Sequence, residues 1–354
     1  MYTKKRKLVT LVMAAVAALG AFASCGKETT KKPEPPTTDE IVCFVAPEPA
    51  ASVKVNKTSL EFVGDLQALY GSEKGYPQAV LVAKATLCAN YGGWVDSFAA
   101  SMTEAATWVN ATTTQPEEIV NAVKSHLTSG LTPSLNTANL SATAIAHSGV
   151  RFEKAIDYKT QINAFLEKLV AVNPSAAKAV ADGFYYTSTA SIATDAPASV
   201  SVYMPDGAPA MSMAKLMKED TATDNITYQV VEASTINTYV TGENPKADLC
   251  VLPLNLASKL LGTGETYKLV GAVTHGNLYM VSSDASVQYT RENLNTLVGK
   301  TVGVVQLQNV PGLTFKVVLN ECQIAWQELT DGASPAADKV NLKAVTPDQV
   351  LPNG

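Results

Sequence analysis

The chain has 354 residues, of which 46% are hydrophobic and 17% are charged, and its formal net charge is −5 at pH 7. This length can hold two domains of ordinary size, and the hydrophobic content is sufficient for buried cores. An acidic chain without clusters of basic residues in its body lacks the charge pattern of a nucleic-acid-binding protein, so no nucleic-acid partner is expected.

The beginning of the chain has the pattern of an export signal. Basic residues at 4–7 precede the apolar run 8–23, which is too short to span a membrane. The run leads into the sequence FASCG, which resembles the lipobox of bacterial lipoproteins, although Phe22 stands where leucine is usual. The resemblance implies a lipoprotein signal peptide over 1–25, lipidation of Cys25 and anchoring by acyl chains to the extracytoplasmic face of the cell membrane. Plain secretion with cleavage near Ser24 is the alternative.

A tether and a mainly helical half follow the signal. Residues 26–40 are polar and rich in proline, which is typical of an extended, solvated tether. From residue 41 onward, apolar runs predict strands, and apolar residues at helical spacing predict helices. The predicted strands are 41–46, 60–66 and 78–83, and the predicted helices are 95–109, 116–126, 141–147, 160–170 and 175–182.

The second half of the chain alternates between strands and helices. Small polar residues at 187–198 indicate a linker before it. Such alternation predicts an α/β fold with mainly parallel sheets and helices on their faces. The predicted strands are 199–204, 228–232, 247–252, 268–273, 278–282, 301–306 and 340–345, and helices are expected up to Lys218 and Leu261, over 290–297 and 311–322, and from Pro347 onward.

Four predicted strands run into a proline and then a helical segment. The prolines are Pro47, Pro209, Pro253 and Pro311. Proline suits the first helical position, because its missing N–H would be unpaired there anyway. The free N–H groups of each helix then point toward the carboxyl end of a strand, where open α/β sheets bind ligands. The four joints are therefore expected to converge on one cleft that binds a small molecule.

Motifs of catalysis and metal binding are missing from the sequence. It contains no GxSxG, HExxH, P-loop or GxGxxG motif. Cys43, Cys88, Cys250 and Cys322 have no CxxC spacing and are interpreted as buried single thiols, with a disulfide as the alternative. No catalytic residue, metal site or cofactor is therefore predicted.

Several segments resemble a known family, the substrate-binding lipoproteins of ABC importers. The similarity is to the nitrate/sulfonate/taurine type among the two-lobed type II periplasmic binding proteins. Segments that resemble the amino-terminal part of that family are VYMPDGAPAMSMAKLM, ADLCVLPLNLASKLL, YKLVGAVTHGNLYMV, LVGKTVGVVQLQNVPGLTFKVVL and VAPEPAAS. Segments that resemble its carboxyl-terminal part are FVGDLQALYG, GYPQAVLVAK and INAFLEKLVAVNP.

The order of these segments differs from the family's order. In the family, the part that resembles 199–354 comes first and the part that resembles 41–186 comes last, so the chain is interpreted as a circular permutant. The resemblance then implies a two-lobed fold with a hinge at the crossing strands 78–83 and 278–282. Residues 75–186 and 199–283 would form lobe 1, residues 41–74 and 284–354 lobe 2, and 187–198 would join the usual termini.

The function implied by the resemblance is that of a solute-binding lipoprotein. It would capture a small organic molecule in the cleft between the lobes by hinge closure. Its partners would be the permease and the ATPase of an ABC importer, and it would act as a monomer. Two alternatives stay open: a pyrimidine-synthesising enzyme on the same scaffold, and a rearranged, non-functional product.

The candidate ligand-binding residues follow the carboxyl ends of the predicted strands. None of these loops contains arginine or lysine, whereas a doubly charged oxyanion usually recruits arginine. Glu48 and Asp206 could face an amine, so a neutral or zwitterionic ligand is expected, such as an aminopyrimidine or a small sulfonate. Each residue also has a structural interpretation, as a helix-starting proline, a turn residue or, for His275, a partner of a backbone carbonyl. The candidates are Asp206, Gly207, Ala208, Pro209, Pro253, Asn255, Thr274, His275, Gly276, Asn277, Gln308, Asn309, Val310, Pro47 and Glu48.

Overall fold

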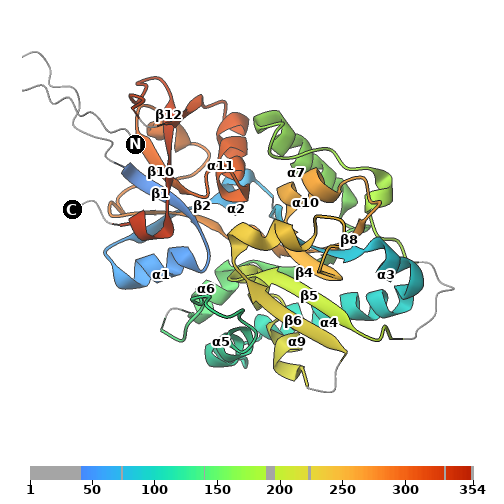
Figure 1. Ribbon diagram of the computed structural model, residues 1–354. Helices are drawn as coiled ribbons and strands as arrows, with labels where there is room; N and C mark the ends of the chain where they lie inside the picture. Colours follow the sequence, from blue (N-terminus) through green and yellow to red (C-terminus); the bar gives the residue numbers. More distant parts are fainter. Residues whose placement is uncertain are drawn as a thin grey trace, which may run out of the picture. The chain divides into compact units, whose positions relative to one another are not determined.

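The computed structural model describes residues 41–351 except 73–74, 139, 189–195, 222–224 and 331, and all of these belong to the compact unit Asp39–Gly354. Four predictions lie outside the described residues: the signal peptide 1–25, the lipidated Cys25, the tether 26–40 and the centre of the linker 187–198. The described part is a mixed α/β structure with two six-stranded sheets (Figure 1).

Both sheets are mixed rather than mainly parallel as predicted. Sheet A has the order β11 (Trp326–Leu329), β12 (Val340–Val345), β10 (Thr301–Val305), β1 (Ile41–Pro47), β9 (Leu278–Ser282) and β2 (Glu61–Asp65). Sheet B has the order β4 (Val150–Lys154), β8 (Tyr267–His275), β3 (Pro77–Lys84), β7 (Leu249–Pro253), β5 (Val200–Pro205) and β6 (Ile226–Val231).

The two sheets share an internal plan. In sheet B, β6, β5 and β7 are parallel, and β3 is antiparallel to its neighbours β7 and β8. In sheet A, β12, β10 and β1 are parallel, and β9 is antiparallel to its neighbours β1 and β2. The chain reaches each of these antiparallel strands from the other sheet, because β3 of sheet B follows β2 of sheet A, and β9 of sheet A follows β8 of sheet B. The described chain therefore passes between the sheets twice, and the strand β9 belongs to sheet A although 278–282 was assigned to lobe 1.

The two crossing segments lie next to each other. One runs through α2 (Leu66–Tyr70) to β3, and the other is the two-residue connection Gly276-Asn277. The N–H of Gly276 donates to the carbonyl oxygen of Tyr76 at 3.0 Å. Gly276 has a φ of 70°, and a Cβ there would lie 2.1 Å from Oε1 of Gln67. Only glycine fits this close approach without strain or displacement of Gln67.

Alternating residues of sheet B bury both of its faces. On β3, Leu81 packs in the cluster that includes α4 (Gly92–Val109) and α9 (Ala214–Glu219), whereas Val80 and Val82 pack in the cluster that includes α7 (Lys159–Val172) and α10 (Leu254–Leu261). This is the period of two expected for a strand covered on both faces. Figure 1 shows α4 and α9 next to each other beside the strands of sheet B.

Sheet A is covered in the same way. Phe44 of β1 packs in a cluster with Ala51 of α1 (Ala50–Lys57), whereas its neighbour Val45 packs in a cluster with residues of α11 (Val310–Glu321). The second cluster also contains Val80 and Leu252 of sheet B. One apolar core is therefore shared between the two sheets. The remaining helices are α3 (Ala85–Asn90), α5 (Pro116–Lys124), α6 (Ala142–His147) and α8 (Ala208–Met211), with 3-10 turns at Asp182–Phe184, Ala233–Tyr239, Leu294–Leu297 and Pro347–Gln349.

Some predicted helices are wrong, and their backbone hydrogen bonds explain why. In 175–182 the N–H of Ala181 donates to the carbonyl oxygen of Gly262, and the N–H of Lys178 donates to the Ser258 hydroxyl. This segment therefore lies alongside α10 and does not form a helix of its own. In 290–297 the Asn293 side chain accepts from the N–H of Thr290, a local bond that competes with helix formation and leaves a single 3-10 turn. The helix expected from Pro347 is also only a 3-10 turn.

The strands β4 and β11 have no counterpart among the predictions. Each lies at an edge of its sheet. Their sequences, VRFEK and WQEL, are short and carry charged residues. Charged residues are common on edge strands because they discourage pairing with other chains, and they weaken the sequence pattern of a strand.

The four described cysteines are free. Cys43, Cys88 and Cys250 are buried and Cys322 is half-buried, in agreement with the interpretation as single thiols. Burial raises the pKa of the Cys43 and Cys88 thiols to about 12, so these groups are poor nucleophiles near neutral pH.

Candidate ligand-binding cavity

A cavity of about 550 Å³ lies where strands of both sheets end. It is lined by residues at or just after the carboxyl ends of β1 and β10 of sheet A and of β5 and β7 of sheet B. Pro47, Pro209, Pro253 and Pro311 all line it, so the expected convergence of the four prolines is confirmed. The volume is in the range of small-molecule sites.

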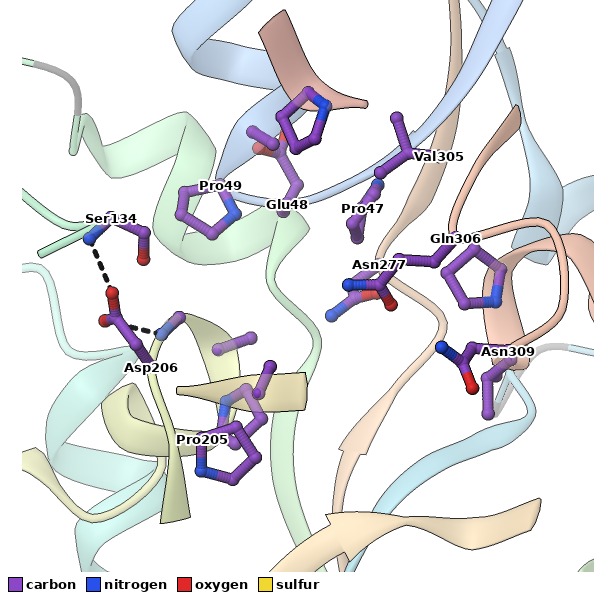
Figure 2. A pocket seen from close by; sticks show the side chains of 18 of the residues that line it. Pro47, Glu48, Pro49, Ser134, Pro205, Asp206, Asn277, Val305, Gln306 and Asn309 are labelled. Carbon is purple, nitrogen blue, oxygen red and sulfur yellow. Dashed lines mark hydrogen bonds between the residues drawn. The ribbon is translucent and has the colours of Figure 1, made fainter. Parts of the chain in front are cut away.

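Most of the candidate residues come together at this cavity (Figure 2). They come from the ends of five strands, β1, β5, β7, β8 and β10, and from the crossing segment between β8 and β9. Whether they bind a ligand stays a prediction. The candidates that line the cavity are Pro47, Glu48, Asp206, Gly207, Ala208, Pro209, Pro253, Thr274, Asn277, Asn309 and Val310.

Four candidates are not among the lining residues. Asn255 is buried in the first turn of α10, where its Nδ2 donates to the carbonyl oxygen of Ala176 at 3.3 Å. Gln308 donates through Nε2 to Glu328, outside the cavity. Gly276 lies against Gln67 in the crossing segment. The fourth, His275, does not reach the cavity because its side chain points to the other face of β8.

His275 is buried on the side of β8 opposite to the cavity wall. Its neighbour Thr274 lines the cavity, and successive side chains of a strand point to opposite faces. His275 is 1% exposed, packs edge-to-face against Tyr158 and has no hydrogen-bond partner for either ring nitrogen among the described residues. Burial, with a smaller effect of the Arg151 charge, lowers the pKa of His275 to about 3, so the ring is neutral. The strand end at THGN therefore predicts the position of this residue but not the direction of its side chain.

The two carboxylates expected to face an amine are both engaged by the protein. Glu48 accepts from the N–H of Ser52 at 3.0 Å and from its hydroxyl at 2.7 Å, and lies 3.4 Å from Nδ1 of His147. Burial raises the pKa of Glu48, and the Ser52 bonds and the His147 charge oppose this shift. Asp206 accepts from the N–H of Gly207 at 2.8 Å and from that of Ser134. In Figure 2 the Glu48 carboxylate points away from Asn277 and Asp206.

Carboxamide side chains gather on the opposite side of the cavity. Asn277, Gln306 and Asn309 lie together across from Asp206 and Ser134 in Figure 2, and Gln78 also lines the wall. Asn277 and Gln306 have left-handed backbones, with φ of 65° and 55°. Left-handed backbone outside glycine is uncommon and is frequently found at binding sites.

Several lining residues were missed from the sequence. Gln306 was taken as the last residue of a strand, whereas β10 ends at Val305. Gln78 was predicted only as part of a crossing strand. Its position at the start of β3, next to the crossing segment, was the signal that could have identified it as a lining residue. Lys54 lies on α1, a helix that the sequence suggested only weakly, and it lines the cavity. Ser134 belongs to a loop without any motif.

Metal and membrane features are not evident in the described part of the chain. Within it, no group of three or more His, Cys, Asp or Glu side chains is placed to hold a metal ion. Among its helices, none is both long enough and apolar enough to cross a membrane.

Comparison with known proteins leaves the family open. The chain matches no family model, and no curated protein or solved structure shows significant similarity to it.

Proposed function

We propose that the chain is an extracytoplasmic solute-binding lipoprotein of an ABC importer that captures a small organic molecule between two lobes. One observation carries the proposal: strand ends from two separate sheets surround a single cavity. Ligands of open α/β sheets bind at the carboxyl ends of strands. The membrane anchor, the permease and ATPase partners and the monomeric state are parts of the same proposal and rest on the sequence resemblance. No catalytic residue or cofactor belongs to it.

The strand order supports the permuted, two-lobed interpretation. In sheet B the parallel strands have the spatial order β6-β5-β7, which is second, first, third along the chain. Sheet A has β12-β10-β1, with a further parallel strand, β11, at its outer edge, and the order of these three strands is the same only if β1 is counted after β12. The first strand of the described chain thus occupies the position that a third strand would take in an unpermuted protein.

The crossing segments support a hinge. The two passages between the sheets are adjacent and joined by the hydrogen bond from Gly276 to Tyr76. Hinges consist of a few connecting residues that absorb changes in φ and ψ. Rotation about this pair of segments would open and close the cavity, with one sheet in each lobe.

A ligand screen that measures both stability and size tests the proposal. The purified full-length chain is screened by thermal shift against a library of small polar metabolites, and hits are examined by small-angle X-ray scattering. A ligand at 100 times its dissociation constant should raise the free energy of unfolding by about 2.7 kcal/mol. It should also reduce the radius of gyration, because closure brings the lobes together.

A cavity-blocking variant supplies the control. Ala233 is exposed and lines the cavity, so Ala233→Trp should abolish the response to ligand without loss of folding. Ala100 is an exposed alanine of α4 that does not line the cavity, so Ala100→Trp should respond like the unaltered protein. Hits that still bind Ala233→Trp, or that bind without compaction, would contradict the proposal.

A further inference from the structure

The charged side chains that line the cavity are mainly acidic. Glu48, Asp206, Glu232 and Asp348 contribute carboxyl groups, and Lys54 is the one cationic residue among the lining residues. The Lys54 ammonium lies 3.5 Å from the backbone carbonyl oxygen of Asp348. Proteins hold carboxylates, sulfonates and phosphates with arginine or with several cations. This wall therefore disfavours an anionic ligand.

The same carboxyl groups offer little to a cationic ligand. Glu48 and Asp206 already accept hydrogen bonds from Ser52 and from backbone N–H groups. Glu232 and Asp348 are exposed, and ion pairs between exposed groups contribute little binding energy. The cavity thus has no dedicated counter-ion of either sign.

Four of the seven uncharged polar side chains that line the cavity are carboxamides. Gln78, Asn277, Gln306 and Asn309 each carry one carbonyl oxygen that accepts and one amino group that donates two hydrogen bonds. Asn277 is the most buried of them at 4% exposure, and its Oδ1 has no partner among the described residues. Its backbone is held in place because its carbonyl oxygen accepts from the N–H of Glu48 at 2.9 Å. A buried polar group without a partner is costly, so a ligand that pairs with this carboxamide gains free energy.

We propose that the cavity takes an uncharged ligand with adjacent hydrogen-bond donors and acceptors in one plane. Carboxamides, cyclic ureas and amino-substituted nitrogen heterocycles form this class. The edge of an Asn or Gln carboxamide pairs with such an edge through two parallel hydrogen bonds, as it does with adenine. Asn277 is the central recognition residue, and Gln78, Gln306 and Asn309 surround it. This inference rests on the proposed function, because it names the ligand class of the same cavity.

Calorimetric titration of the full-length chain with two sets of probes tests the inference. The uncharged set is nicotinamide, cytosine, thymine and 4-aminopyrimidine at pH 7.5, and the anionic set is nitrate, sulfate, methanesulfonate and acetate. At least one uncharged probe is expected to bind, and to bind at least tenfold more tightly than every anion. Tighter binding of any anion, or no binding of any uncharged probe, overturns the inference.

Substitution of the central carboxamide sharpens the test. Asn277→Asp keeps the size of the side chain, and aspartate, like asparagine, tolerates the left-handed backbone at this position. The substitution replaces the amino group by a charged oxygen. It should weaken the binding of the uncharged probe by about tenfold to a hundredfold, the discrimination expected of a bidentate contact. Asn121→Asp, at an exposed position of α5, is the matched control and should leave affinity unchanged. Equal affinities of both variants would overturn the role of Asn277.

The two proposals fail in different ways. An anion that binds and compacts the protein would leave the solute-binding function intact and overturn only the uncharged class. Compounds that bind the Ala233→Trp variant as tightly as the unaltered chain would show that they do not bind in the cavity, and this result would overturn the proposed function.

Discussion

Replacement of His275 by leucine should make the protein more resistant to acid while lowering its free energy of unfolding at pH 7.5 by no more than about 1 kcal/mol. The imidazole is buried, and neither nitrogen has a hydrogen-bond partner among the described residues. Leucine is close in size and apolar, so the substitution breaks no side-chain hydrogen bond and leaves no polar atom unsatisfied. The lost edge-to-face contact with Tyr158 would cost about 1 kcal/mol.

The magnitude of the acid effect follows from the pKa. Burial lowers the pKa of His275 from 6.5 to about 3. Below pH 6.5 the unfolded chain binds a proton that the folded protein does not bind, so stability falls as the pH decreases. Each pH unit corresponds to about 1.4 kcal/mol. Between pH 6.5 and pH 5 this residue should therefore cost the unaltered protein about 2 kcal/mol, and His275→Leu should not show this loss.

Urea denaturation at pH 7.5, 6 and 5 measures the difference between the two proteins. Parallel pH profiles would refute the conclusion that His275 is buried in its neutral form. Ligand affinity provides an independent readout, because His275 does not line the cavity and its replacement should leave binding unchanged. A loss of affinity without a change in acid stability would instead support the sequence-based prediction that His275 contacts the ligand.

Two further substitutions examine the crossing segment and the Glu48 carboxyl. Gly276→Ala should lower the free energy of unfolding by about 1–2 kcal/mol, because φ is 70° and the new Cβ would lie 2.1 Å from Oε1 of Gln67. Gly130→Ala, with φ of 86° and nothing within 4 Å, should show backbone strain alone, and equal losses in thermal melts would disprove a contribution of the Gln67 contact. Glu48→Gln should abolish a decrease in stability as the pH rises above 4.5, because burial raises the pKa of Glu48 and the folded protein keeps a proton that the unfolded chain releases. Denaturation between pH 4 and 7 measures this slope, and a slope unchanged by the substitution would contradict it.

The place of the cavity was predictable from local sequence because proline carries a strong positional signal. Pro209 and Pro311 are the second residues of α8 and α11, each after a short loop that leaves a strand, and Pro253 is the last residue of β7 at the amino-terminal boundary of α10. The carboxyl ends of strands are also the general ligand position in α/β sheets. Together these two rules located the cavity without knowledge of strand order.

Side-chain direction and long-range pairing were not predictable in the same way. Thr274 and His275 are adjacent in the sequence, yet only Thr274 lines the cavity, because a shift of one residue along a strand reverses the face. Gln78 and Gln306 reach the same wall from two different sheets, and no local motif relates them. Their proximity depends on strand order, which a single sequence specifies only through the complete fold.

The position of β1 has a consequence for how the chain folds. All strands of sheet B lie between residues 77 and 275, a continuous stretch that can form its own sheet. β1 and β2 precede this stretch, whereas their partners β9 and β10 follow it. Contacts so distant along the chain form late, because a large loop must close first.

β1 and β2 therefore remain without their shared partner β9 until residue 282 has been synthesised, and β1 remains without β10 until residue 305. During that time the apolar run IVCFVA of β1 has no neighbouring strand in its own sheet and is prone to aggregate. Sheet B is therefore expected to fold first, and the completion of sheet A is expected to be the slow step in folding.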